Sequence, residues 1–214
     1  MTSFNEKAVD DSNWAADIAA IPDAPGWLAA LANTVPLANP TAEQVKSAFA
    51  FIEGKWKVKK YENVYERMKM EGFGTIETRM LLSAPLRLSY ALSGTSFSQE
   101  LSLSGVKKFP AISYRVGTSV AVISPPLNGR RDCTRLHIID GKAVCITEKM
   151  REVKGTATDA EPSRDVIACE FTYWVKFDGR LEVRSFEYLV GDCRAKAEAA
   201  HRITSISCKT MMVL

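Results

Sequence analysis

Segments that direct a chain into or across a membrane are missing from this sequence. The N-terminal residues MTSFNEKAVDD are polar and acidic, whereas a signal peptide is basic and then apolar. No long uncharged apolar run occurs among the 214 residues, so no ordinary spanning helix is predicted. Thr2 and the C-terminal MMVL do not fit the N-myristoylation and prenylation motifs. We therefore expect a cytosolic protein whose contact with membranes is peripheral.

Histidine and paired cysteine are scarce as well. His137 and His201 are the only histidines, and neither has a cysteine or carboxylate at the spacing of a zinc motif. Cys133 lies four residues from His137, but in a strand this spacing is about 13 Å, too far for a nucleophile and its base. The five cysteines are odd in number and include no C-x-x-C pair, so we expect reduced, structural thiols. The sequence indicates no metal, no cofactor and no catalytic residue.

An excess of one charge is also lacking. The 28 Lys and Arg residues are balanced by 25 Asp and Glu residues, and the formal net charge is only +3. A nucleic-acid-binding surface needs a concentrated positive potential, so no nucleic-acid partner is predicted. With 46% hydrophobic residues, the chain has enough apolar side chains for one ordinary core. These features are typical of a soluble globular protein.

The first 48 residues predict a helical extension. This region is rich in Ala and is divided by four prolines into short pieces such as SNWAADIAAI and PGWLAALANTV. Thr41 and Gln44 form a capping-box pattern before AEQVKSAFAF. Because Trp14 and Trp27 are costly to leave exposed, we expect the extension to dock on the rest of the protein or on a partner.

Residues 49–214 have the pattern of an antiparallel sheet. Apolar Leu86, Leu88, Tyr90 and Leu92 alternate with more polar neighbours, as on the two faces of one strand. The same kind of short alternating segment predicts strands near 97–103 and at 111–116, 133–139, 143–149, 166–177 and 180–190. The hairpin signals between them are Ser93-Gly94, Asn128-Gly129, Asp140-Gly141 and Asp178-Gly179.

A helical interruption is predicted between the first strand and the others. ENVYERMKM and TIETRMLL read as two short helices, within residues 63–83, and Gly72-Phe73-Gly74 breaks the helical pattern between them.

This opening resembles the fatty-acid-binding and retinoid-binding proteins of the calycin group. The best match is FIEGKWKVKKYENVYERMKMEGFG, in which these residues fall on the family's positions: Gly54, Trp56, Glu62, Asn63, Met68, Lys69, Gly72 and Gly74. Weaker matches are AISYRVG at 111–117, GRRDCTRLHIIDGKAV at 129–144 and FDGRLEV at 177–183. The resemblance implies a ten-stranded antiparallel up-and-down barrel, capped by a helix-turn-helix.

The resemblance also implies intracellular binding and transport of a hydrophobic ligand, such as a long-chain fatty acid or related acid, without enzymatic activity. The family binds the ligand carboxylate with an Arg-x-Tyr in its last strand, and Arg202 with Thr204 is the candidate here. Lys176 falls near the family's second interior arginine. The alternatives are a surface arginine on a C-terminal helix, since CRAKAEAAHRI favours a helix, and a solvated strand lysine.

The family's ligand portal lies between its first helix and a facing loop. Val64, Arg67 and Met68 fall on that helix, and Val106 or Phe109 falls in the loop, although ordinary packing would explain the same residues. Lysines along residues 55–60 and at 107–108 offer transient contact with an anionic membrane surface.

Two alternatives to ligand transport remain open. The barrel could be a protein-interaction module with a vestigial cavity, in which the N-terminal extension binds a partner or a second copy of the chain. Because one fold can carry different functions, the protein could also be an isomerase that modifies a fatty acid.

Overall fold

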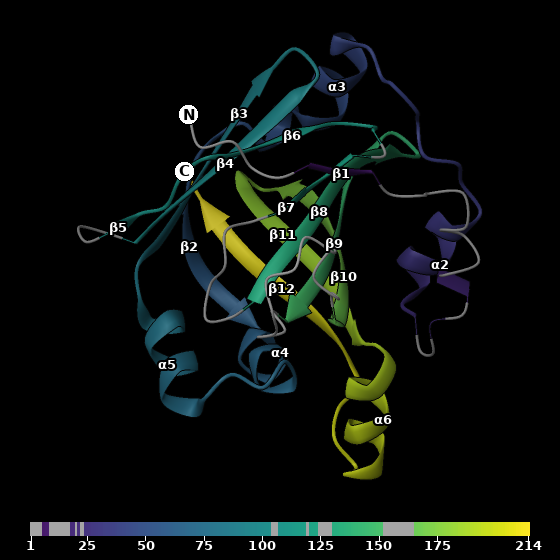
Figure 1. The fold of residues 1–214 in the computed structure, drawn as a ribbon. Helices are drawn as coiled ribbons and strands as arrows, with labels where there is room; N and C mark the ends of the chain where they lie inside the picture. Colours follow the sequence, from purple (N-terminus) through teal and green to yellow (C-terminus); the bar gives the residue numbers. More distant parts are fainter. Residues whose placement is uncertain are drawn as a thin grey trace, which may run out of the picture.

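The described residues form one antiparallel sheet of twelve strands. The structure is a computed structural model that describes residues 6–8, 18–19, 21, 24–103, 107–118, 120–123, 130–151 and 165–214. Ten of the strands form a nearly closed barrel (Figure 1). They are β2 (Gly54–Glu62), β3 (Leu86–Ser93), β4 (Ser96–Leu103), β6 (Ile112–Arg115), β7 (Val120–Ile123), β8 (Arg130–Ile139), β9 (Lys142–Arg151), β10 (Asp165–Phe177), β11 (Arg180–Leu189) and β12 (Ser205–Val213). The predicted barrel is confirmed.

Strands β2, β3, β4 and β6 pair in this order, β7 to β12 pair in sequence order, and β12 returns to pair with β2. A parallel bridge between Val116 and Leu136 joins the β6 side of the barrel to β8. Two short strands lie outside the barrel path: β1 (Glu6–Ala8) pairs with β7, and β5 (Lys107–Lys108) pairs with β4.

The predicted Asp-Gly turns connect two of these hairpins. Asp140 and Gly141 have φ values of 50° and 69°, and Asp178 and Gly179 have φ values of 49° and 70°. A tight type I′ turn needs positive φ at both central residues, which Asp tolerates and Gly adopts without strain. The predicted turn at Asn128-Gly129 lies outside the described residues.

Helices cover both ends of the barrel (Figure 1). Helices α4 (Val64–Met70) and α5 (Thr75–Ser83) form the predicted pair at one end, where α6 (Gly191–Ala199) also lies. At the other end lies α3 (Ala42–Phe49), followed by the 3-10 turn η1 (Ala50–Ile52). The capping box of α3 forms as predicted, because the Thr41 N–H donates to Gln44 and the Gln44 N–H donates to Thr41. The boundary expected after residue 48 thus falls inside α3.

The N-terminal region contributes to two separate cores. Val45, Phe49 and Ile52 are fully buried in the core inside the barrel. Helix α2 (Gly26–Ala32) instead packs on the outer face of the sheet, where Leu28 and Leu31 join Phe171 and Phe186 in a second core. Trp14 lies outside the described residues.

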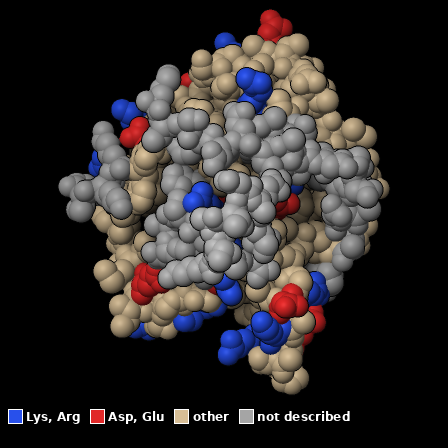
Figure 2. Space-filling model, viewed as in Figure 1, with Lys and Arg blue, Asp and Glu red and all other residues tan. Residues whose placement is uncertain are grey.

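The surface agrees with the balanced composition. Figure 2 shows Lys and Arg interspersed with Asp and Glu on the described part of the visible face. No helix in the described part of the chain has the length and apolar character to span a membrane.

Candidate ligand-binding site in the barrel

The inward side chains near α3 are apolar and largely aromatic. Phe49 reaches into the barrel from α3, and its ring centroid lies 5.1 Å from that of Phe97 and 6.4 Å from that of Trp174. Tyr90 stacks on Phe97 at 5.4 Å. Because the rings pack tilted or stacked at these distances, this end of the interior is a dense apolar floor.

Toward the α4 end the inward faces become polar. The strand register places Thr134, Thr147, Glu170 and Glu187 in one row across β8, β9, β10 and β11. The Oγ1 atoms of Thr134 and Thr147 lie 3.2 Å apart. The interior therefore has an apolar half and a polar half, an arrangement suited to an amphipathic ligand.

Five charged side chains form an ionic cluster in the polar half: Arg67 of α4, Glu71 at the C-cap of that helix, Lys149 of β9, Glu170 of β10 and Glu187 of β11. The ammonium group of Lys149 lies 2.9 Å from Glu71 Oε1 and 3.0 Å from Glu170 Oε2, and it also donates to Glu187. Arg67 Nη1 donates to Glu170 Oε1 at 2.6 Å. The cluster thereby joins the helix to three strands of the barrel.

Burial and charge shift the acidity of the cluster in opposite directions. Burial raises the pKa of Glu187 to about 8, a shift that Lys149 only partly opposes. Burial acts in the same direction on Glu170, but the charges of Arg67 and Lys149 outweigh it and lower the pKa of Glu170 to about 2. At neutral pH, Glu170 is therefore ionised and Glu187 largely holds its proton.

Of the predicted portal residues, Arg67 lies in the ionic cluster. Val64 and Met68 are buried with Cys208 of β12 in a small core between helix and barrel. Phe109 is half-buried, and its N–H donates to Leu101 O. Val106 lies outside the described residues.

Arg202 and Lys176, the two basic residues predicted to bind the ligand carboxylate, lie outside the ionic cluster and are exposed. Arg202 is exposed beyond the end of α6, where its N–H donates to Ala197 O and His201, with φ of 51°, donates to Glu198 O. This C-cap pattern ends the helix before β12 begins at Ser205, so the prediction of Arg202 as an interior residue is wrong. Thr204 is half-buried just before the strand.

Lys176 lies on the same face of β10 as buried Trp174, but it is exposed because the strand ends one residue later. It is distant in register from the row containing Glu170.

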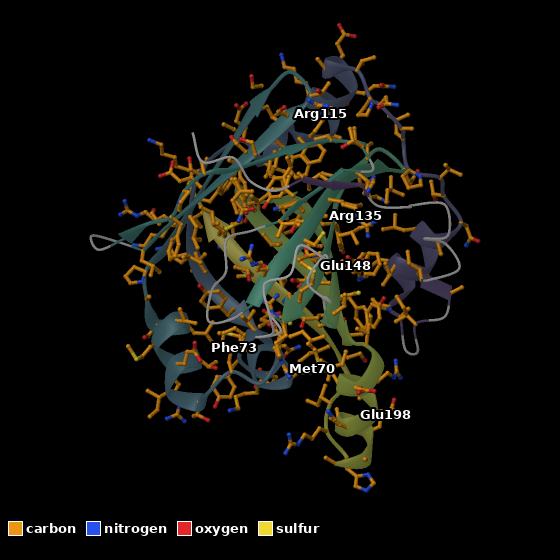
Figure 3. The ribbon with its side chains drawn as sticks, in the orientation of Figure 1. Met70, Phe73, Arg115, Arg135, Glu148 and Glu198 are labelled. Carbon is orange, nitrogen blue, oxygen red and sulfur yellow. The ribbon has the colours of Figure 1, made fainter. Side chains whose placement is uncertain are left out.

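Four members of the ionic cluster were not predicted from the sequence: Glu71, Lys149, Glu170 and Glu187. The available signal was a charged residue on the inward phase of an otherwise apolar strand, as for Glu170 in IACEFTYW and Glu187 in RSFEYLV. The outer face has its own pair: Arg135 and Glu148, which approach within 3.8 Å (Figure 3). Among the described residues, no group of three or more His, Cys, Asp or Glu side chains is arranged to hold a metal ion.

Comparison with known proteins supports the fold. No protein-family model and no curated protein sequence matches the chain. Among solved structures, the REP1-NXSQ fatty acid transporter is similar at 19% identity and a TM-score of 0.50, over 77% of this chain and 96% of that protein. Caenorhabditis elegans lipid binding protein 8 is 13% identical, with a TM-score of 0.50, over 78% and 96% of the two chains.

A fatty acid binding protein from Schistosoma mansoni, solved in complex with arachidonic acid, is 9% identical, with a TM-score of 0.50, over 78% of this chain and 97% of that one. At such low identities, the similarity describes the fold. The barrel with its helix pair therefore has the fold of the intracellular fatty-acid-binding proteins.

Proposed function

We propose that this protein reversibly binds and transports a hydrophobic small molecule with a long apolar chain. The observation that carries the proposal is the division of the barrel interior into an apolar, aromatic half and a polar half beneath α4. The apolar half would bury the chain of the ligand, and each buried methylene contributes about 0.8 kcal/mol. The similar structures named above include a fatty acid transporter and an arachidonic acid complex, which supports the same class of ligand.

A long-chain fatty acid or related acid is the ligand expected from the sequence. In the described interior, however, the two cations of the ionic cluster already pair with glutamates. An acid would have to displace one of these glutamates or enter with its proton. We therefore propose the broader class of ligand and include the acid as one arm of the test.

Native mass spectrometry of the protein purified without added lipid provides the first test. A co-purified long-chain molecule is expected, released on denaturation. The second measurement is displacement of the apolar dye Nile red by oleic acid, oleyl alcohol and oleylamine, which share one chain. At least one should displace the dye in a saturable manner.

The alternative of a protein-interaction scaffold is favoured by one observation. Phe49, contributed by the N-terminal region, fills the barrel end together with Phe97 and Trp174. If the protein is an interaction scaffold, native mass spectrometry will give the mass of the polypeptide without a ligand, and none of the three ligands will displace the dye. A partner protein or self-association through the extension would then become the leading proposal.

A further inference from the structure

Two buried atoms of the ionic cluster have no hydrogen-bond partner in the described part of the chain. One is a donor, Arg67 Nε, and the other is an acceptor, Glu187 Oε1. The side chain of Glu187 is 0% exposed. The two groups are neighbours, because Arg67 Nε lies 3.8 Å from the other oxygen of the same carboxylate. A buried polar atom without a partner is costly, so this pair indicates where a ligand headgroup would gain hydrogen bonds.

The charges around these atoms disfavour an incoming carboxylate. The cluster contains three carboxyl groups but only two cations, and the carboxyl of Asp132, whose pKa is raised by burial, interacts with the same cations. Lys149 already contacts all three glutamates, and Arg67 donates to Glu170. An incoming carboxylate would bring only acceptors and a further negative charge into a buried site. It would leave Glu187 Oε1 without a donor whenever Glu187 is ionised.

An ammonium group has the opposite mismatch. It brings only donors, so it would leave Arg67 Nε without an acceptor and would have to lose its own hydration. A hydroxyl group both donates and accepts, and it carries no charge. It suits either protonation state of Glu187, whose pKa burial raises to about 8.

We propose that the polar half of the barrel recognises the hydroxyl of a long-chain neutral lipid, which accepts from Arg67 Nε and pairs with Glu187 Oε1. This inference rests on the proposed function and adds the chemical class of the headgroup. Water is the competitor for the same two atoms. The lipid gains over water because its chain is buried against the apolar half of the interior.

Oleic acid, oleyl alcohol and oleylamine have the same hydrocarbon chain, so differences in their affinity report recognition of the headgroup. With the full-length protein at neutral pH, oleyl alcohol should displace Nile red at a concentration at least tenfold lower than oleic acid or oleylamine. Equal or tighter displacement by the acid or the amine would overturn the hydroxyl assignment and leave the proposed function intact. Displacement by none of the three would overturn the proposed function.

A variant and its matched control test the role of Glu187. Glu187→Gln keeps the shape of the side chain but removes its ionisable group, so an incoming acid no longer meets the ionised form of Glu187 and the preference for alcohol over acid should fall below threefold. Glu182→Gln removes a carboxylate from the opposite face of the same strand, where Glu182 pairs with Arg184, and should leave the preference unchanged. The Glu187→Gln protein must first show a cooperative thermal unfolding transition, which establishes that it is folded. If its preference for the alcohol over the acid is then unchanged, the selectivity comes from other groups.

Discussion

The charged side chains inside the barrel compensate one another's buried charge. Lys149 is 9% exposed and is the one ammonium that contacts all three glutamates of the ionic cluster. Arg67 strengthens the arrangement from α4, and the pKa values of both basic groups are raised by the surrounding carboxylates against the opposing effect of burial. The cluster therefore stays together because each member compensates the buried charge of the others.

Replacement of Lys149 should be strongly destabilising. Lys149→Met would leave buried carboxylates without their shared partner, and loss of one member of a buried ion pair costs about 3 to 5 kcal/mol. Urea denaturation would measure the change in the free energy of unfolding. Lys142→Met is the control, since Lys142 is exposed and pairs with exposed Asp140 at the hairpin. A loss below about 1 kcal/mol for Lys149→Met would mean that the glutamates are compensated by other groups.

Glu187 should make the protein less stable as pH rises from about 5 to about 8. Its pKa is near 8 in the native protein, against an ordinary value of 4.5, because the carboxyl group is buried. Between these values the native state keeps a proton that the unfolded chain releases, so the free energy of unfolding falls with rising pH.

Glu187→Gln removes this dependence, and wild-type stability relative to the variant should therefore decline across the range. Chemical denaturation at several pH values would measure it, and a constant difference between the two proteins would contradict the assignment.

At the scale of elements, α2 stabilises the barrel from outside. Its Leu28 is 0% exposed within the second core, and the Trp27 ring lies 4.6 Å from the ring of Tyr173 on β10. The outward residues of β8, β9, β10 and β11 that meet this helix are apolar, whereas outward residues of a solvated sheet are polar. The helix is thus part of the folded domain's second core.

Leu28→Ala should lower the free energy of unfolding by about 2 to 5 kcal/mol, since it removes a buried side chain and leaves a cavity. Val35→Ala, in the same N-terminal region but 87% exposed, should have little effect. Thermal and urea unfolding of both variants would test the prediction. Equal stability of the two variants would show that α2 contributes little to the fold.

At the scale of the whole molecule, an apolar groove lies along α5, at the end of the barrel that α4 and α5 cover. It is lined by Phe73, Ile76, Met80 and Leu81, and Ile76 and Met80 are 77% and 68% exposed. Met70 and Phe73 lie at this end of the molecule (Figure 3). Exposed apolar side chains beside the helix pair, where the sequence predicts the ligand portal, would suit the transient membrane contact that is also expected from the sequence.

We predict that the double variant Ile76→Ser and Met80→Ser transfers a bound fluorescent lipid to anionic phospholipid vesicles at least threefold more slowly, with its ligand affinity unchanged. The apolar side chains would no longer enter the membrane interface. Val35→Ser serves as the control for removal of an exposed apolar side chain at a distant position. Equal transfer rates for all three proteins would exclude a role for this groove.

Local sequence patterns predicted most of the barrel strands, the helix pair and the α3 cap, but they did not locate β7 or β12. Alternation defines the faces of β3, Asp140-Gly141 and Asp178-Gly179 supply the positive φ values of tight hairpins, and Thr41 with Gln44 caps α3. Each of these features depends on interactions between residues close together in the chain, so it can be predicted from the local sequence.

The binding site required the tertiary structure. Arg202 looked like the basic anchor, but the C-cap of α6 keeps it outside the barrel. The ionic cluster combines Arg67 with Lys149, Glu170 and Glu187, which are far apart in the sequence and meet only when β9, β10 and β11 pair in register beneath α4. The burial that raises the pKa of Glu187 exists only in the closed barrel. The sequence by itself determined which segments alternate, turn and cap, whereas long-range strand pairing decided which charges share the interior, because charge compensation depends on distances in space.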